Sequence, residues 1–347
     1  MASAPKERAG RPAVSVIMPV RNEAPHLRAS VSRVLADPYD GDLEIVLAVG
    51  PSSDGTERIA AEIAAESSQV VVVPNPSGRT PVGLNAAIAA SRHEILVRVD
   101  GHGFLPAGYV DTAVTLLEET GAANVGGRMV PAGTTPFEEA AAWAMSSRFG
   151  IGGGRFHVGG KAGPVETVYL GVFRRSALIP LGGFDEHFTR AQDWELNYRI
   201  RRAGGLVWFD PRLQVVYRPR PSLRALARQF HGSGRWRREV LQKYPETASM
   251  RYLAPPIALT AIVLGLAAGL IGYTTGPAVL RTALVLPVGY LAVVLAGTAV
   301  SARSIPVRAV LRVPAVLVWM HMTWAAGFLR GTRTRAASPA TGTATPA

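Results

Sequence analysis

Over the first two thirds of the chain, short apolar runs alternate with segments whose apolar residues recur at helical spacing. Apolar, β-branched runs of strand length occur at 14–20, 43–50, 70–74 and 94–100. Apolar residues at helical spacing separate these runs at 23–36, 52–67 and 81–91. Strands joined by helices of this length form a mostly parallel sheet with helices on both faces. We therefore expect an α/β fold that binds its ligand at the carboxyl ends of the strands, near Pro19, Gly50 and Asp100.

The last third of the chain has a different pattern. Residues 253–272 and 282–301 are uncharged stretches, and 313–329 is a shorter apolar segment between Arg312 and Arg330. About 20 apolar residues span a bilayer as a helix, so the first two are predicted to cross a membrane. The third either crosses or lies at the interface, and buried core helices are the alternative for all three. Residues 1–12 and 331–347 are predicted to be disordered.

The charge of the chain changes this picture in one respect. The formal net charge is +12, and residues 212–251 hold ten Arg or Lys against two Glu. This basic block directly precedes the apolar segments, which favours a membrane surface over nucleic acid as its partner and places the block on the cytoplasmic side. A third crossing would put Arg330, Arg333 and Arg335 outside, against the preference of basic flanking residues for the cytoplasmic side. Cysteine is absent, which excludes a disulfide scaffold and a thiolate metal site.

Two stretches carry candidate chemistry. Asp100, Gly101 and His102 end the fourth strand, and an extended backbone there would point the carboxylate and the imidazole to one side. Such a pair suits Mg²⁺ or Mn²⁺ bridging two phosphates, with Gly101 leaving room for them. Asp193 lies in the first turn of a predicted helix, where the helix dipole favours a carboxylate. For the first stretch, the alternative is that Asp100 caps the next turn and His102 lies in solvent. For the second stretch, the alternative is that Asp193 only caps its helix.

Together these stretches resemble one family. The motifs are VSVIMPVRNEAPHL, SSDGTERI, NPSGRTPVGLNAAI, VRVDGHG, YLGVFRRSAL and GGFDE followed by QDWELNYRIRRAG, in order from about Val14. They resemble those of family 2 inverting glycosyltransferases of the GT-A fold. VRVDGH and QDWELNYR are most similar to the succinoglycan-type membrane glucosyltransferases.

The resemblance implies roles for individual residues. The donor-binding residues would be Pro19, Arg21, Glu23, Asp54, Asn85 and Asp100. Asp100 and His102 would match the metal motif, and Asp193 would match the general base that deprotonates the acceptor hydroxyl. Gln192, Arg235 and Trp236 would contact the acceptor or a diphosphate.

The chain departs from the family pattern in two places. Val49 and Gly50 stand where the family usually has paired carboxylates, one of which binds the nucleobase. Processive members carry Gln-x-x-Arg-Trp, whereas Gln229 here precedes Arg235 and Trp236 at a different spacing. An amphipathic helix lying in the lipid headgroups is the alternative explanation of this basic stretch. The glycine-rich segment 148–163 is expected to be a mobile loop over the acceptor side, with an ordinary surface loop as its alternative.

The sequence thus predicts a GT-A domain at 13–220, a basic interfacial segment at 221–250 and a membrane region of two or three helices at 251–330. We expect a bacterial enzyme at the cytoplasmic membrane, with its catalytic domain facing the cytoplasm. It would transfer a sugar with inversion from a UDP- or GDP-sugar to a polyprenyl-linked acceptor, using a divalent metal and no nucleic acid. A polyprenyl-phosphate sugar synthase and a non-catalytic nucleotide-binding scaffold are the alternatives.

Overall fold

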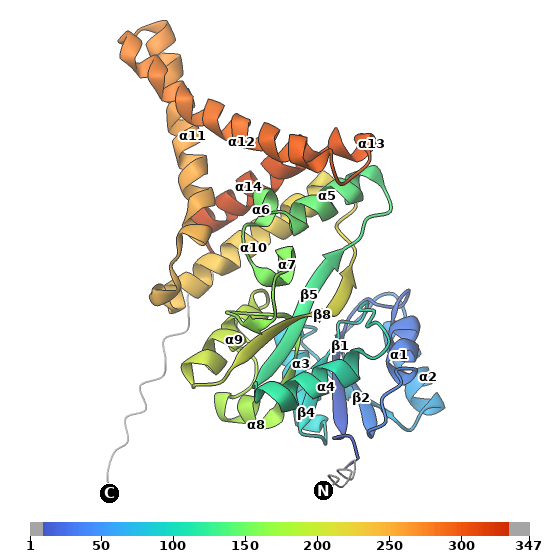
Figure 1. The fold of residues 1–347 in the computed structure, drawn as a ribbon. Helices are drawn as coiled ribbons and strands as arrows, with labels where there is room; N and C mark the ends of the chain where they lie inside the picture. Colours follow the sequence, from blue (N-terminus) through green and yellow to red (C-terminus); the bar gives the residue numbers. More distant parts are fainter. Residues whose placement is uncertain (1–9, 333–347) are drawn as a thin grey trace, which may run out of the picture.

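The computed structural model describes residues 10–332. Apart from 10–12 and 331–332, the segments predicted to be disordered lie outside this range. One eight-stranded sheet forms the centre, in the order β3-β2-β1-β4-β7-β5-β8-β6 (Figure 1). Its strands are β1 Val14–Val20, β2 Leu43–Val49, β3 Val70–Pro74, β4 Ile95–Arg98, β5 Asn124–Pro131, β6 Gly163–Pro164, β7 Tyr169–Arg174 and β8 Val207–Tyr217.

The predicted parallel sheet is confirmed for the first four strands. β1 pairs in parallel with β2 and β4, and β2 pairs in parallel with β3. The sheet becomes mixed at β7, which runs antiparallel to both β4 and β5. β5 and β8 are again parallel to each other. Because β7 is antiparallel to β4, the start of β7 at Tyr169 lies beside the carboxyl end of β4, and the candidate site forms there.

Helices cover both faces of the sheet, as predicted. α1 (Leu27–Leu35), α2 (Thr56–Glu66) and α4 (Tyr109–Thr120) bury their apolar faces against one side. α3 (Thr80–Ala90), α8 (Arg175–Leu178) and α9 (Gln192–Arg202) pack on the other. α1 begins at Leu27, later than the predicted start at residue 23, because residues 21–26 form turns that are fastened to the loop after β2.

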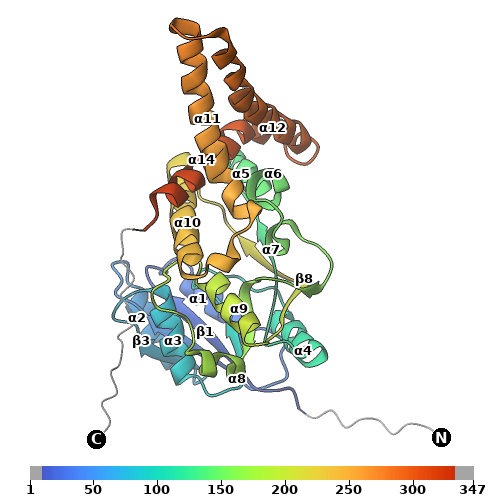
Figure 2. The same ribbon diagram turned by 90° about the vertical axis from the view of Figure 1, so that its left-hand side faces the viewer.

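A third apolar cluster joins the α/β domain to the C-terminal helices. It contains residues of α5 (Pro136–Ser146), α10 (Leu223–Lys243), α12 (Val285–Ser301), α13 (Val307–Val310) and α14 (Val313–Arg330). α11 (Met250–Thr274) and α12 extend away from the domain (Figures 1 and 2). The segments Met250–Thr274, Ala278–Ser301 and Val307–Arg330 are all long and apolar enough to span a membrane.

α14 differs from α11 and α12 in its surroundings. It packs along α10 in the same direction, and the two backbones approach at two glycines. A Cβ added to Gly234 would lie 2.0 Å from the carbonyl oxygen of Trp324, and one added to Gly327 would lie 2.0 Å from that of His231. Only glycine allows helices to approach this closely. α10 occupies residues 223–243 of the basic segment predicted at 221–250, and one of its faces is covered by α14.

This contact gives a prediction about stability. Gly327→Val should lower the free energy of unfolding by about 1–3 kcal/mol, because the added side chain forces the two backbones apart. Gly289→Val is the matched control, since a Cβ at Gly289 in α12 meets nothing within 4 Å. Thermal unfolding of the full chain in detergent measures both. Equal effects of the two substitutions would contradict the tight contact.

Candidate active site

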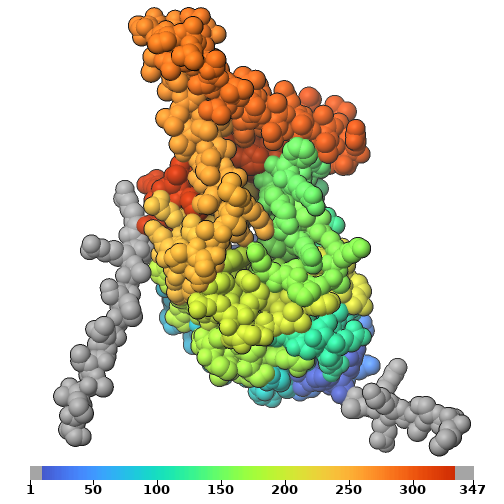
Figure 3. All heavy atoms as spheres, turned by 60° about the vertical axis from the view of Figure 1, so that its left-hand side comes forward, coloured from blue at the N-terminus to red at the C-terminus, as the bar shows by residue number. Residues whose placement is uncertain are grey.

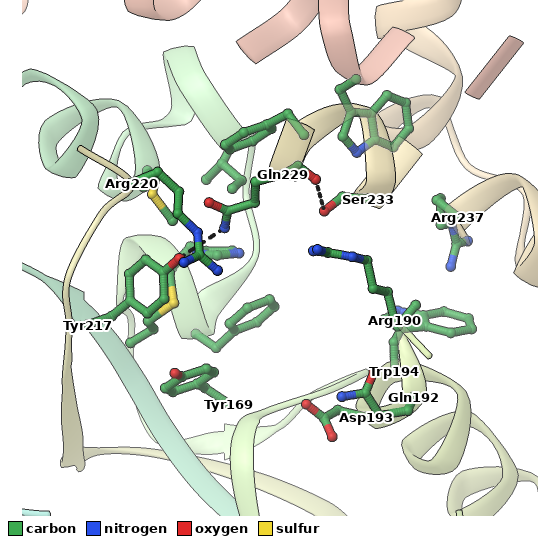
Figure 4. A pocket seen from close by; sticks show the side chains of 18 of the residues that line it. Tyr169, Arg190, Gln192, Asp193, Trp194, Tyr217, Arg220, Gln229, Ser233 and Arg237 are labelled. Atoms are coloured by element: carbon green, nitrogen blue, oxygen red, sulfur yellow. Dashed lines mark hydrogen bonds between the residues drawn. The ribbon is translucent and has the colours of Figure 1, made fainter. Parts of the chain in front are cut away.

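The site is one large cavity between the α/β domain and the C-terminal helices. Its volume is about 1110 Å³. Seven of the residues proposed from the sequence line it, namely Pro19, Arg21, Glu23, Asp100, His102, Gln192 and Asp193. The opposite wall comes from α10, from the first turns of α11 and from α14. Figure 4 shows how side chains from these separate elements converge on the cavity.

Arg98 connects the two acidic groups of the site. Its side chain is 4% exposed at the end of β4, and it donates to Asp193 and, at 3.0 Å, to Asp100. Both carboxylates hold the pKa of Arg98 above its ordinary value, although burial acts to lower it. Burial raises the pKa of Asp193 to about 6, whereas the charge of Arg98 acts to lower it. Asp193 is therefore ionised at neutral pH and remains able to accept a proton.

The backbone around Asp100 differs from the sequence prediction. β4 ends at Arg98, and residues 101–102 form a turn closed by a hydrogen bond from Gly103 N to Asp100 O at 2.7 Å. The prediction that an extended backbone points Asp100 and His102 to one side is therefore wrong. The residues two apart whose side chains meet are instead Arg98 and Asp100. Gly101 lines the cavity and lies against Glu23. A Cβ at Gly101 would lie 2.7 Å from Glu23 Cγ, so the glycine makes room for Glu23.

Asp100 and His102 each retain an atom that could bind a metal ion. Asp100 accepts from Arg98 through Oδ1, and His102 Nδ1 lies 2.7 Å from Glu23 Oε1. Glu23 raises the pKa of His102 by this hydrogen bond, against the effect of burial. Asp100 Oδ2 and His102 Nε2 remain, a donor set that suits Mn²⁺ or Mg²⁺. No group of three metal-ligating side chains occurs within residues 10–332, so the ion would need oxygen atoms from a bound substrate.

Four residues proposed from the sequence do not line the cavity. Asp54 accepts from Thr56 Oγ1 and from the amides of Ala24 and Thr56, so it fastens the start of α2. Asn85 bonds both backbone polar groups of Phe184 at 2.8 Å and fixes the turn before α9. Asp54 and Asn85 thus support the site from outside the cavity.

Arg235 and Trp236 also lie away from the cavity, and helix geometry explains why. Arg235 donates to the Gly331 carbonyl at the end of α14, and Trp236 packs against His187 and Phe188. Positions four apart share a helix face, so Gln229, Ser233 and Arg237 face the cavity instead. The i, i+4, i+8 spacing of these three polar residues is the sequence signal that would have identified them.

Two further arginines point into the centre of the cavity. Arg190 precedes α9, and Arg220 follows β8 (Figure 4). Burial and the charge of Arg220 lower the pKa of Arg190. Neither guanidinium has an ion-pair partner among the described residues, whereas Asp100 and Asp193 are paired with Arg98. The centre of the cavity therefore presents uncompensated positive charge, which suits a phosphorylated ligand.

A carboxylate and an imidazole after the end of a strand line the same cavity as an acid at a helix start, which is the arrangement that the family resemblance predicts. A sequence model of Glycosyl transferase family 2 matches residues 15–182. The chain is 30% identical over 321 residues to succinoglycan biosynthesis protein ExoA of Rhizobium meliloti (strain 1021), covering 91% of this chain and 93% of that protein. The chain therefore belongs to glycosyltransferase family 2.

Two other proteins are similar. Glycosyltransferase AglE of Haloferax volcanii is 26% identical over 225 residues, which cover 63% of this chain and 71% of that protein. The mannosyltransferase PcManGT of Pyrobaculum calidifontis, solved in complex with GDP-Man and Mn²⁺, has the same fold. Its TM-score is 0.55 at 18% identity, and the match covers 93% of this chain and 87% of that one. The predicted GT-A fold and the family resemblance are both confirmed.

Proposed function

We propose that this glycosyltransferase moves a sugar, with inversion, from a nucleoside diphosphate donor to a lipid-linked acceptor at the cytoplasmic membrane of a bacterium. The observation that carries the proposal is that one cavity joins Asp100, Asp193 and the first turns of α11. The proposed donor site, the proposed base and the start of a proposed membrane helix thus border the same cavity. The relationship to a succinoglycan biosynthesis protein supports a role in polysaccharide synthesis.

The donor diphosphate binds between the end of β4 and the two central arginines. Asp100 and His102 would hold a divalent ion, which supplies charge neutralisation to the departing diphosphate. The Mn²⁺ bound with GDP-Man in PcManGT supports this assignment. Arg190 and Arg220 bind the same diphosphate, since guanidinium groups match phosphate oxygens in charge and geometry. Pro19, Arg21 and Glu23 line the cavity beside them, on the donor side.

Asp193 acts as the general base. Its carboxylate takes the proton of the acceptor hydroxyl while that oxygen bonds to the anomeric carbon. The bond from this carbon to the diphosphate oxygen breaks on the opposite face, which inverts the configuration. An acceptor that attacks through a phosphate oxygen would need no base, so a base-competent Asp193 favours a hydroxyl acceptor over the lipid monophosphate used by a polyprenyl-phosphate sugar synthase.

Removal of the base gives the first test of this function. Asp193→Asn should lower sugar transfer by about 10²–10⁴-fold, the usual contribution of base catalysis. Transfer is measured with membranes containing the full chain, labelled UDP- and GDP-sugars and lipid extract, and EDTA should abolish it. Asp185→Asn is the matched control, because Asp185 pairs with Lys243 and does not line the cavity.

The outcomes separate the alternatives. Comparable losses in the two variants would contradict a specific role for Asp193. A product with one sugar on a lipid monophosphate would identify the synthase instead. Nucleotide binding without sugar transfer to any acceptor would indicate a non-catalytic nucleotide-binding scaffold.

We also propose that α11 and α12 cross the bilayer and that α14 lies along its cytoplasmic surface. One end of the α13–α14 segment is tied to α5 of the GT-A domain, and the other end is tied to α10. Arg308 lies 3.7 Å from Glu139 of α5, and Arg235 and Arg238 of α10 donate to carbonyls at the end of α14. α14 could cross only if α10 entered the bilayer beside it. α10 carries Arg224, Arg228, Arg235, Arg237, Arg238, Glu239 and Lys243, and charged residues in the bilayer core are costly.

This topology places the basic residues of α10, Arg303, Arg308, Arg312 and Arg330 on one side and leaves Arg281 between α11 and α12 on the other, which agrees with the positive-inside rule. Single cysteines test it without background, because the chain contains none. In spheroplasts, an impermeant maleimide should label Thr275→Cys between α11 and α12. Ser304→Cys and Thr332→Cys should react only after permeabilisation, as should the inside reference Arg228→Cys on α10. Labelling of Thr332→Cys in intact spheroplasts would show that α14 crosses.

A further inference from the structure

A second pair of cationic residues lies on the wall that α10 and α11 supply to the cavity. Arg237 of α10 and Arg251 at the start of α11 both line it. Arg237 is 6% exposed, and its guanidinium lies 4.2 Å from the Trp194 ring centroid and 3.6 Å from that of Tyr252. Its Nη2 donates to Thr247, whereas Nε and Nη1 are buried without a partner among the described residues.

The charges around Arg237 do not balance it. Burial lowers the pKa of Arg237, and the charge of Arg251 lowers it further. Tyr252 and the exposed Glu166 act in the opposite direction, but neither forms an ion pair with it within residues 10–332. Unpaired buried cations are costly in a folded protein. The cost is recovered when an anion binds, so the arrangement indicates a ligand site.

The glycine-rich segment shapes this group of residues. Arg251 lies against Gly152 and Gly154, and a Cβ on Gly154 would be only 2.5 Å from its guanidinium Nη2. The segment forms two short helices, α6 (Arg148–Ile151) and α7 (Arg155–Val158), with these glycines between them. Figure 3 shows this green part of the chain beside the base of α11. The glycines therefore give the Arg251 side chain its room at the cavity wall.

His157 completes the surroundings of Arg251. Its imidazole lines the cavity, and its Nδ1 has no partner among the described residues. Burial, together with the charge of Arg251, lowers the pKa of His157 to about 3. The ring is therefore neutral at physiological pH and adds a polar group that can donate to an anion without further charge repulsion.

We propose that Arg237 and Arg251, the latter given its room by Gly152 and Gly154, form a binding site for the phosphate groups of a lipid-linked acceptor. The inference rests on the proposed function. Arg251 lies in the first turn of α11, the helix that we propose enters the bilayer, which is the depth at which a lipid carries its phosphate. Trp194 follows Asp193 directly and its ring lies beside Arg237. The acceptor would thus extend from its phosphate at Arg237 and Arg251 to its reacting hydroxyl at Asp193.

Binding of a short prenyl diphosphate to the purified full chain in detergent tests the site. Wild type should bind farnesyl diphosphate, and farnesol should bind at least about 10-fold more weakly. Arg251→Gln should weaken farnesyl diphosphate binding at least about 10-fold, because a charge-assisted contact is lost. Gly154→Ala should weaken it in the same direction by displacing Arg251. Arg228→Gln, an exposed arginine of α10 outside the cavity, is the matched control.

UDP and GDP binding distinguishes the two sources of phosphate. Arg251→Gln should change the nucleotide dissociation constants by less than about twofold. An equal loss of nucleotide binding would assign these arginines to the donor diphosphate and overturn the proposal. Unchanged farnesyl diphosphate binding in Arg251→Gln, or farnesol binding as tight as the diphosphate, would also overturn it. Because no sugar transfer is involved, these results are independent of the Asp193 assay.

Discussion

The ion pairs of Arg98 are the interaction on which the site depends. A guanidinium that is 4% exposed requires charged partners, because an unpaired buried charge is costly. Arg98 finds both partners inside the cavity, in Asp100 at the end of β4 and in Asp193 at the start of α9. The requirement to neutralise one buried cation therefore fixes the proposed metal ligand and the proposed base relative to each other. The raised pKa of Asp193 shows that burial outweighs the influence of Arg98.

The second constraint is the close approach of α10 and α14 at Gly234 and Gly327. This contact holds an apolar helix against a basic amphipathic one, so that residues of α10 and α14 line the same cavity. The catalytic domain alone would supply only the sheet side of this space. The C-terminal helices, which are long and apolar enough to span a membrane, therefore form part of the same cavity as the candidate active-site residues. This arrangement suits an enzyme whose donor comes from water and whose acceptor comes from lipid.

Much of the fold could be predicted from the sequence, because strand-length apolar runs and helical spacing are local signals. The positions of Asp100, His102 and Asp193 on the cavity followed from the family resemblance. Arg98 was missed, although a charged residue within an apolar strand signals a buried ion pair. Arg235 and Trp236 were chosen by motif, whereas Arg237 faces the cavity because of its helical phase relative to Gln229. The packing of α14 on α10 depends on tertiary contacts that hydropathy cannot reveal.

The most direct test of the central claim is the pH dependence of kcat/KM for wild type and for Arg98→Met. Wild-type kcat/KM should fall as the pH drops through about 6, because Asp193 must be deprotonated to act as a base. Arg98→Met should move this acidic limb to higher pH, since the lost cation favoured the carboxylate. Arg98→Lys, which keeps the charge, should leave the limb near its wild-type position. An acidic limb at the pH of an ordinary carboxyl group, or one that does not move in Arg98→Met, would contradict the account.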